Sequence, residues 1–265
     1  MMGCYVKKQS LNERFALLEP NIQVFGPKDE AKRPALILFH GCGGLRDHVL
    51  LYAEIAAMKG IRAFVVDSFA PRGWGRSTAT SLICTGLMFQ GYERAGDVLA
   101  VLWGLSQRAD VDQNQIMLMG ESHGGWAIMD LMTLKLDRSG QAGISDPDPR
   151  LLDGVKGLFL VYPYINFPAR TNINDWHYSP KTMVIAAKHD HLTPLFHTRQ
   201  ICKRLKSKGL PLDMIELNAS HAFDEVENDG LIMQYNPDAT KSALDALIGF
   251  LAEVFGSKAD EKVSA

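Results

Sequence analysis

The sequence G-E-S-H-G at residues 120–124 is a candidate nucleophile turn. An apolar segment at residues 116–119 precedes it and a helix-like segment at residues 126–132 follows it, which predicts the order strand, sharp turn, helix. Flanking glycines permit a strained turn that holds the Ser122 hydroxyl at the start of the helix, ready to attack a carbonyl carbon. We therefore interpret Ser122 as a nucleophile that forms an acyl-enzyme.

A serine nucleophile needs a histidine that accepts its proton and a carboxylate that orients this histidine. Asp190 follows the strand-like residues 183–187, and His221 follows the strand-like residues 214–217. The chain order serine, acid, histidine is that of the α/β-hydrolase fold, in which acid and base lie on loops after later strands. The sequence therefore predicts a catalytic triad of Ser122, Asp190 and His221.

The glycine-rich sequence H-G-C-G-G at residues 40–44 ends another strand-like segment and is typical of an oxyanion hole. We expect the backbone N–H groups of Cys42 and His123 to be its donors, because His123 directly follows the nucleophile. A tight strand-to-helix turn without catalytic role is the alternative for residues 40–44.

The loop after the strand at residues 61–66 supplies two candidate substrate-binding residues, Arg72 and Trp74. Arg72 could bind a substrate carboxylate, or it could pin its own loop by pairing with Asp67 or a carbonyl oxygen. Tyr164 is a third candidate. It belongs to an aromatic loop at residues 162–181 whose rings either line a pocket or pack the loop onto the sheet; these rings are Tyr162, Tyr164, Phe167, Trp176 and Tyr178.

The sequence H-D-H at residues 189–191 permits a second interpretation, in which two histidines and an aspartate bind a metal ion. Alternate residues of an extended segment point to opposite sides, and no fourth ligand stands at a recognisable spacing. We expect neither a metal ion nor an organic cofactor. Glu121, inside the nucleophile turn, is interpreted as a structural polar contact rather than a catalytic acid.

Strand-like and helix-like segments alternate along the chain. The strand-like segments are residues 35–39, 61–66, 116–119, 158–161, 182–187 and 214–217, and the helix-like segments are residues 49–59, 92–107, 126–132, 195–205 and 242–254. Such alternation predicts an α/β fold with a mostly parallel central sheet flanked by helices. The loop at residues 162–181 is too short for a large cap domain.

The composition is that of one globular domain: 265 residues, 46% of them hydrophobic, with a net charge of −2. We expect a single domain over residues 1–265, with a core at about 34–255, an N-terminal extension at 1–33 and a C-terminal tail at 256–265. No run is dense in lysine or arginine and the isoelectric point is near 6.4, so neither nucleic acid nor a membrane is an expected partner.

A cytoplasmic location is predicted from two observations. The first twenty residues lack the uninterrupted apolar region of a signal peptide. The cysteines lie far apart without a C-x-x-C pair, which suits reduced thiols; they are Cys4, Cys42, Cys84 and Cys202.

Five motifs together resemble those of the dienelactone hydrolase family of α/β hydrolases, over roughly residues 34–250. They are HGCGG at 40–44, VVDSFAPRG at 65–73, GESHGG at 120–125, HDHLTP at 189–194 and ASHAF at 219–223. The resemblance implies a compact hydrolase without a cap and the same triad, Ser122, Asp190 and His221.

The chain departs from the enzymes that open dienelactones, which use a cysteine nucleophile, an acidic residue on the oxyanion strand and an arginine shortly after the catalytic histidine. Here these positions hold Ser122, the pair His40 and Gly41, and Asp224. A carboxylate at Asp224 is expected to repel an anionic lactone, so the resemblance carries over the fold and the triad but not the dienelactone substrate.

The predicted function is therefore a serine hydrolase that cleaves a small-molecule carboxylic ester or lactone. An acyltransferase, a peptidase or a carbon–carbon hydrolase with the same triad is the first alternative, because the acceptor is chosen by pocket shape. A hydrolase fold retained as a non-catalytic binding protein is the second. The oligomeric state does not follow from one sequence.

Overall fold

The computed structural model describes residues 8–256, and these form one seven-stranded sheet in the order β1-β3-β2-β4-β5-β6-β7. The strands are β1 (Ile22–Phe25), β2 (Arg33–Phe39), β3 (Arg62–Val66), β4 (Val111–Glu121), β5 (Val155–Val161), β6 (Lys181–His189) and β7 (Leu212–Ser220). Strand β1 pairs antiparallel with β3, and every other neighbouring pair of this sheet is parallel. The carboxyl ends of β2, β4, β6 and β7 therefore meet at one edge.

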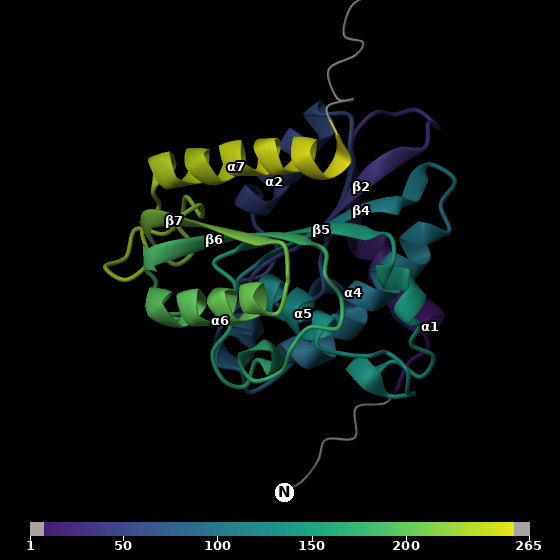
Figure 1. Cartoon of the computed structure of the whole chain (residues 1–265), viewed down its shortest axis with the longest axis horizontal. Coiled ribbons are helices and arrows are strands. Elements are labelled where there is room, and N and C mark those ends of the chain that lie inside the picture. Colours follow the sequence, from purple (N-terminus) through teal and green to yellow (C-terminus); the bar gives the residue numbers. More distant parts are fainter. Residues whose placement is uncertain (1–7, 257–265) are drawn as a thin grey trace, which may run out of the picture.

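Helices cover both faces of the sheet (Figure 1). Helices α2 (Asp47–Met58) and α7 (Pro237–Phe255) pack on one face. The other face carries α1 (Leu11–Leu18), α4 (Gly91–Ser106), α5 (His123–Met132) and α6 (Leu195–Ser207). Short helical turns lie in the loops: η1 (Glu19–Asn21), η2 (Ala70–Arg72), α3 (Arg76–Thr78), η3 (Ala79–Ile83), η4 (Gln141–Gly143), η5 (Pro149–Leu152) and η6 (Arg170–Asn172).

The central strands are buried on both faces, which explains their near-continuous apolar sequences. In β2, alternate residues enter different cores: Ile37 packs with α4 and α5, whereas Leu36 and Leu38 pack with α2 and α7. The prediction of a mostly parallel sheet flanked by helices, without a large cap over residues 8–256, is confirmed.

Two elements at the N-terminal side were not predicted. Helix α1 has a capping box between Ser10 and Glu13, and its buried Arg14 donates to Asp97 of α4 at 2.7 Å. Strand β1 has only four residues, and its middle two are exposed. Short elements of this kind have too little apolar periodicity to stand out. Part of the expected extension at 1–33 thus belongs to the sheet, whereas residues 257–265 of the expected tail lie outside the described residues.

A disulfide joins the loop after β2 to the long loop at residues 68–88. Cys42 and Cys84 are bonded, with their Cα atoms 5.1 Å apart. The prediction of reduced thiols is therefore wrong for these two residues, since a separation of 42 positions gives no sign that they meet. Cys202 is a buried free thiol, and Cys4 lies outside the described residues. The cytoplasmic prediction loses one of its two supports.

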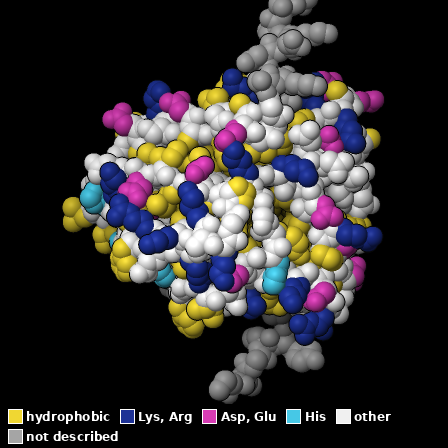
Figure 2. Space-filling model, viewed as in Figure 1, with side chains coloured by type: hydrophobic (Ala, Val, Ile, Leu, Met, Phe, Trp, Pro, Cys, Tyr) yellow, Lys and Arg dark blue, Asp and Glu magenta, His cyan; other side chains and the backbone are white. Residues whose placement is uncertain are grey.

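Charged side chains of both signs are interspersed on the face seen in Figure 2. Over residues 8–256, no helix is long and apolar enough to span a bilayer.

Candidate active site

The candidate nucleophile lies at a sharp turn between β4 and α5. Ser122 has φ 45° and ψ −108°, a strained conformation for a residue with a side chain. A Cβ atom at Gly124 would lie 2.1 Å from the Phe39 carbonyl oxygen, and one at Gly120 would lie 2.5 Å from the Gly124 carbonyl carbon. The two glycines are thus required by close backbone packing, and they lift the serine side chain out of the turn.

The candidate base and acid lie at the ends of the two strands beyond β5. His221 follows β7 and its Nε2 is 2.9 Å from Ser122 Oγ, while its Nδ1 is 2.7 Å from Asp190 Oδ2, just after β6. Asp190 Oδ1 accepts the backbone N–H groups of Leu192 and Thr193, each at 2.8 Å. With Nδ1–H donated to the carboxylate, Nε2 of the imidazole is free to accept the serine proton.

A buried cluster of Tyr162, Tyr52 and Asp224 packs against the His221 imidazole. The Tyr162 ring centroid lies 4.9 Å from that of His221. Asp224, only 1% exposed, accepts the hydroxyls of Tyr162 at 2.5 Å and Tyr52 at 2.8 Å. Burial beside this carboxylate raises the pKa of both tyrosines well above the usual value. The expected place of Asp224 facing a substrate is corrected, because its carboxylate is bound to these hydroxyls and does not line the cavity beside His221.

The residues predicted for the oxyanion hole lie on two segments beside Ser122. Cys42 follows β2, and a Cβ atom at the preceding Gly41 would lie 3.6 Å from Ser122 Cβ. His123 is the first residue of α5, so its amide belongs to the positive end of the helix dipole. This arrangement brings both backbone segments beside the serine.

Arg94 on α4 links these two segments by hydrogen bonds to both of them. Its Nη1 donates to the His40 carbonyl oxygen at 2.8 Å and to His123 Nδ1 at 3.1 Å, and its Nε donates to Ser68 Oγ at 3.2 Å. His123 Nε2 in turn donates to the Phe89 carbonyl oxygen at 2.8 Å. Burial lowers the pKa of Arg94 to about 9, so the guanidinium stays charged at neutral pH. Burial and this cation hold the pKa of His123 well below its usual value.

Arg94 was not predicted as a site residue. Its only signal in the sequence is an arginine within the apolar helix-like segment at residues 92–107. A fully buried arginine in such a place requires polar partners, which is a reason to examine it.

Arg72 and Trp74 lie away from Ser122. Arg72 donates to both carboxylate oxygens of Asp97, at 2.7 and 3.0 Å, and to the Ser68 carbonyl oxygen at 2.5 Å. Trp74 packs against the Phe69 and Phe89 rings. Neither residue lines a cavity that contains Ser122. Their expected substrate contacts are corrected accordingly. Arg72 pins its loop through the Ser68 carbonyl oxygen, as the alternative held, and its carboxylate partner is Asp97 rather than Asp67.

Ser122 lines two cavities, and we name each of them by one of its other residues. The His221 cavity has a volume of about 350 Å³; its lining includes Arg46, His48, Glu121, His221, Glu225 and Met233. The Trp126 cavity has a volume of about 280 Å³; its lining includes Ile83, His123, Trp126, Tyr164, Phe167 and Leu192. Cys42, Cys84 and Leu192 border both cavities, so the disulfide forms part of the wall between them.

The aromatic loop at residues 162–181 divides between the two expected roles. Tyr164 lines the Trp126 cavity, and its ring lies 5.1 Å from that of Trp126. Trp176 instead is buried and donates to Thr171 Oγ1, while Tyr178 donates to the Lys135 carbonyl oxygen.

A buried ion pair borders the His221 cavity. His48 Nε2 of α2 lies 2.9 Å from Glu121 Oε2 at the end of β4. Burial alone would lower the pKa of His48, but the carboxylate of Glu121, together with those of Asp224 and Glu225, raises this pKa to about 9. Burial raises the pKa of Glu121 as well, in opposition to the imidazolium. The expected structural contact of Glu121 is therefore an ion pair, with a histidine that sequence reasoning did not single out.

The possible metal ligands at residues 189–191 point to different partners. Asp190 binds His221, while His189 Nε2 lies 2.9 Å from Asn218 Oδ1. His191 lines the His221 cavity. Within residues 8–256, no group of three or more His, Cys, Asp or Glu side chains is arranged to hold a metal ion.

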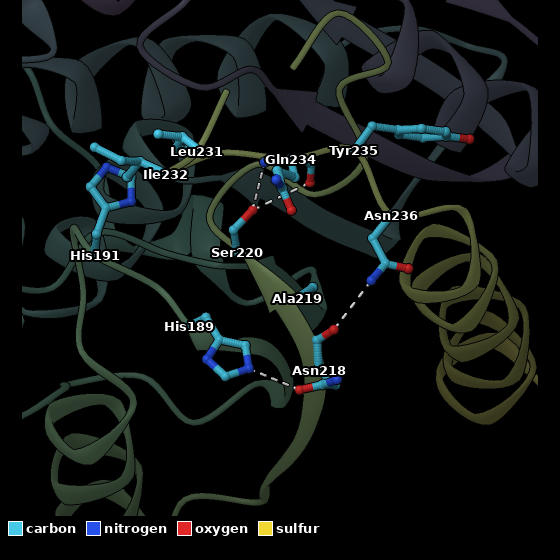
Figure 3. Close-up of a pocket in the computed structure, with 10 residues that line it drawn as sticks. All are labelled: His189, His191, Asn218, Ala219, Ser220, Leu231, Ile232, Gln234, Tyr235 and Asn236. Atoms are coloured by element: carbon cyan, nitrogen blue, oxygen red, sulfur yellow. Dashed lines mark hydrogen bonds between the residues drawn. The ribbon is translucent and has the colours of Figure 1, made fainter. Parts of the chain in front are cut away.

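A larger cavity of about 490 Å³ lies along β7, outside the catalytic groups (Figure 3). The residues that line it are His189 and His191 on either side of Asp190, residues 218–220 before His221, and members of the segment 231–236. The Gln234 N–H donates to Ser220 Oγ at 2.8 Å, and Asn236 Nδ2 donates to the Asn218 carbonyl oxygen at 3.2 Å. These contacts hold the loop after His221 against the end of the strand.

Several solved structures share this fold. Esterase 2 of Thermogutta terrifontis has 15% identity and a TM-score of 0.67, covering 91% of this chain and 90% of that chain. The same esterase phosphonylated by sarin has 14% identity and a TM-score of 0.62, covering 89% and 90%. A dienelactone hydrolase-like promiscuous phosphotriesterase from metagenomic libraries has 16% identity and a TM-score of 0.65, covering 88% and 92%. No curated protein matched the sequence.

The family comparison covers nearly the whole described domain. The model of the dienelactone hydrolase family matches residues 22–255, from the first residue of β1 to the last of α7. This range contains every motif on which the sequence resemblance depended. The chain therefore belongs to the dienelactone hydrolase family.

Proposed function

We propose that the chain is a serine esterase that hydrolyses a small-molecule carboxylic ester or lactone through an acyl-enzyme on Ser122. The observation that carries the proposal is the hydrogen-bonded series from Asp190 through His221 to Ser122, at a strained turn that ends a strand. Family membership supports hydrolase chemistry independently of these distances.

In the first half of the reaction, Ser122 Oγ attacks the ester carbonyl carbon while its proton passes to His221 Nε2. The Cys42 and His123 amides stabilise the negative charge that forms on the carbonyl oxygen. His221 then donates this proton to the leaving alcohol oxygen, so that the carbon–oxygen bond breaks and the acyl group stays on Ser122.

In the second half, a water molecule attacks the acyl carbon and gives its proton to His221. The Ser122 oxygen leaves with a proton from the same imidazole, and the carboxylic acid is released. Asp190 orients the imidazole and stabilises the imidazolium through their hydrogen bond.

The test uses the turnover of p-nitrophenyl acetate and covalent labelling by a fluorophosphonate probe. We expect both in the wild type and neither in Ser122→Ala. Ser207→Ala is the matched control, because this serine only donates to the Arg204 carbonyl oxygen at an exposed helix end, and it should label normally. A folded wild type that neither labels nor turns over an ester would refute the proposal. Mass spectrometry of the products with alcohols present would reveal acyl transfer instead of hydrolysis.

A further inference from the structure

The two cavities beside Ser122 differ in their relation to the base. His221 lines the first cavity and is absent from the lining of the second, which instead contains His123 and Trp126. The imidazole must donate a proton to the leaving alcohol oxygen, and such transfer needs a separation of about 2.6–3.2 Å. On the proposed esterase mechanism, the alcohol portion of the substrate therefore occupies the His221 cavity and the acyl portion occupies the Trp126 cavity.

The charged side chains of the His221 cavity already contact one another or Glu227, which is not part of its lining. Arg46 lies 3.1 Å from Glu225 and 2.6 Å from Glu227, and His48 pairs with Glu121. Arg76 also reaches Glu227, at 3.4 Å. Cations and carboxylates thus neutralise each other here, while Leu192 and Met233 add apolar surface. A strongly anionic alcohol portion finds no uncompensated cation in this set.

A residue that lines this cavity carries a buried acceptor without a donor. Glu121 is 1% exposed, its Oε2 faces His48, and its Oε1 has no hydrogen-bond partner among residues 8–256. A buried carboxylate oxygen without a donor is costly, so a ligand that supplies an O–H or N–H group gains a charge-assisted hydrogen bond. Glu121 is also the immediate chain neighbour of Ser122, and adjacent Cα atoms are about 3.8 Å apart. The donor must therefore lie only a few bonds from the cleaved ester bond.

We propose that the substrate is an ester of a short alcohol that carries a hydroxyl or a protonated amine, which donates to Glu121 Oε1. Glu121 then determines specificity for the alcohol portion, and the Trp126 cavity receives the acyl chain.

The test compares butanoate esters whose alcohol portions match in size. The 3-hydroxypropyl ester carries a donor, the isomeric 2-methoxyethyl ester carries only an acceptor, and the butyl ester carries neither. The 2-(dimethylamino)ethyl and 3-methylbutyl esters form the corresponding ammonium pair. For each ester, kcat/KM is divided by its rate of hydroxide hydrolysis. We expect the donor esters to exceed their matched esters about 10-fold, and the two pairs distinguish a hydroxyl from an ammonium.

The variant Glu121→Gln tests the residue. A glutamine can turn its amide oxygen to His48 and its N–H groups to the cavity, so the preference for hydroxypropyl over methoxyethyl should fall to about one or below. Tyr164→Phe, in the opposite cavity, is the control and should keep the wild-type preference whatever its rate. Both comparisons are ratios within one protein, so a loss of folded enzyme does not change them.

Equal normalised rates for donor, ether and alkyl esters in the wild type would overturn this inference, even if Glu121→Gln does not fold. An unchanged preference in a folded Glu121→Gln would overturn the role of Glu121. Both results differ from a failure of the proposed function, in which the wild type hydrolyses none of the esters and resists the fluorophosphonate.

Discussion

Replacement of Arg94 by methionine should lower kcat about 100-fold and change KM little. One guanidinium donates both to the carbonyl oxygen of His40, which begins the loop of Cys42, and to the ring of His123. It therefore aligns the two segments that carry the proposed oxyanion donors. Loss of one such donor costs about 10²–10³-fold in kcat. The effect falls on kcat because the donors act on charge that develops in the transition state.

The same variant should also be less stable. Without the guanidinium, three buried acceptors lose a donor: the His40 carbonyl oxygen, His123 Nδ1 and Ser68 Oγ. Each acceptor left without a donor costs about 1–3 kcal/mol of stability. The variant no longer buries a cation, however, and this offsets part of the total loss. We expect the free energy of unfolding to fall by about 3 kcal/mol.

The assay must separate these two effects. Initial rates over a range of p-nitrophenyl acetate concentrations give kcat and KM at a temperature where circular dichroism shows the variant folded. Arg72→Met is the matched control, because it breaks a buried pair with Asp97 and a bond to the Ser68 carbonyl oxygen outside both cavities. It should lose stability and keep its kcat. A folded Arg94→Met with the wild-type kcat would refute the positioning role.

Three further predictions concern the disulfide, Asp190 and the pair of His48 with Glu121. Cys84→Ser removes the disulfide to Cys42, which spans 42 positions, and should lower the free energy of unfolding in urea by up to about 4 kcal/mol. Reduction of the wild type by dithiothreitol should lower its free energy of unfolding by the same amount. Asp190→Asn should lower kcat about 10⁴-fold in the ester assay, because an amide no longer holds the required imidazole tautomer. His48 has a folded pKa of about 9, above the usual 6.5, so its pair with Glu121 stabilises most below pH 6.5 and is lost as pH rises through 9. The stability difference between wild type and His48→Gln should therefore shrink by about 3 kcal/mol over that range of pH, and a difference independent of pH would contradict the pairing.

The sequence predicted that Ser122, Asp190 and His221 meet, because each follows its own strand. Parallel strands end at a common edge, so Ser122 after β4, Asp190 after β6 and His221 after β7 are brought together by topology that alternating apolar segments already indicate. The turn around Ser122 was likewise recognisable from its glycines, because close backbone packing there leaves no room for a Cβ atom. Helix α1 and strand β1 escaped prediction because they are short and half-exposed.

The sequence by itself determined local features: the order of strands and helices, the sharp turn at Ser122, and the chain order of serine, acid and histidine. Only the tertiary structure decided which distant side chains meet. Cys42 with Cys84, Arg72 with Asp97, and Glu121 with His48 are pairs of this kind. Hydrophobic periodicity specifies which face of an element is buried, but a partner across the core is chosen by packing of the whole chain. The linings of the two cavities, and with them the proposed specificity, depend on those pairings.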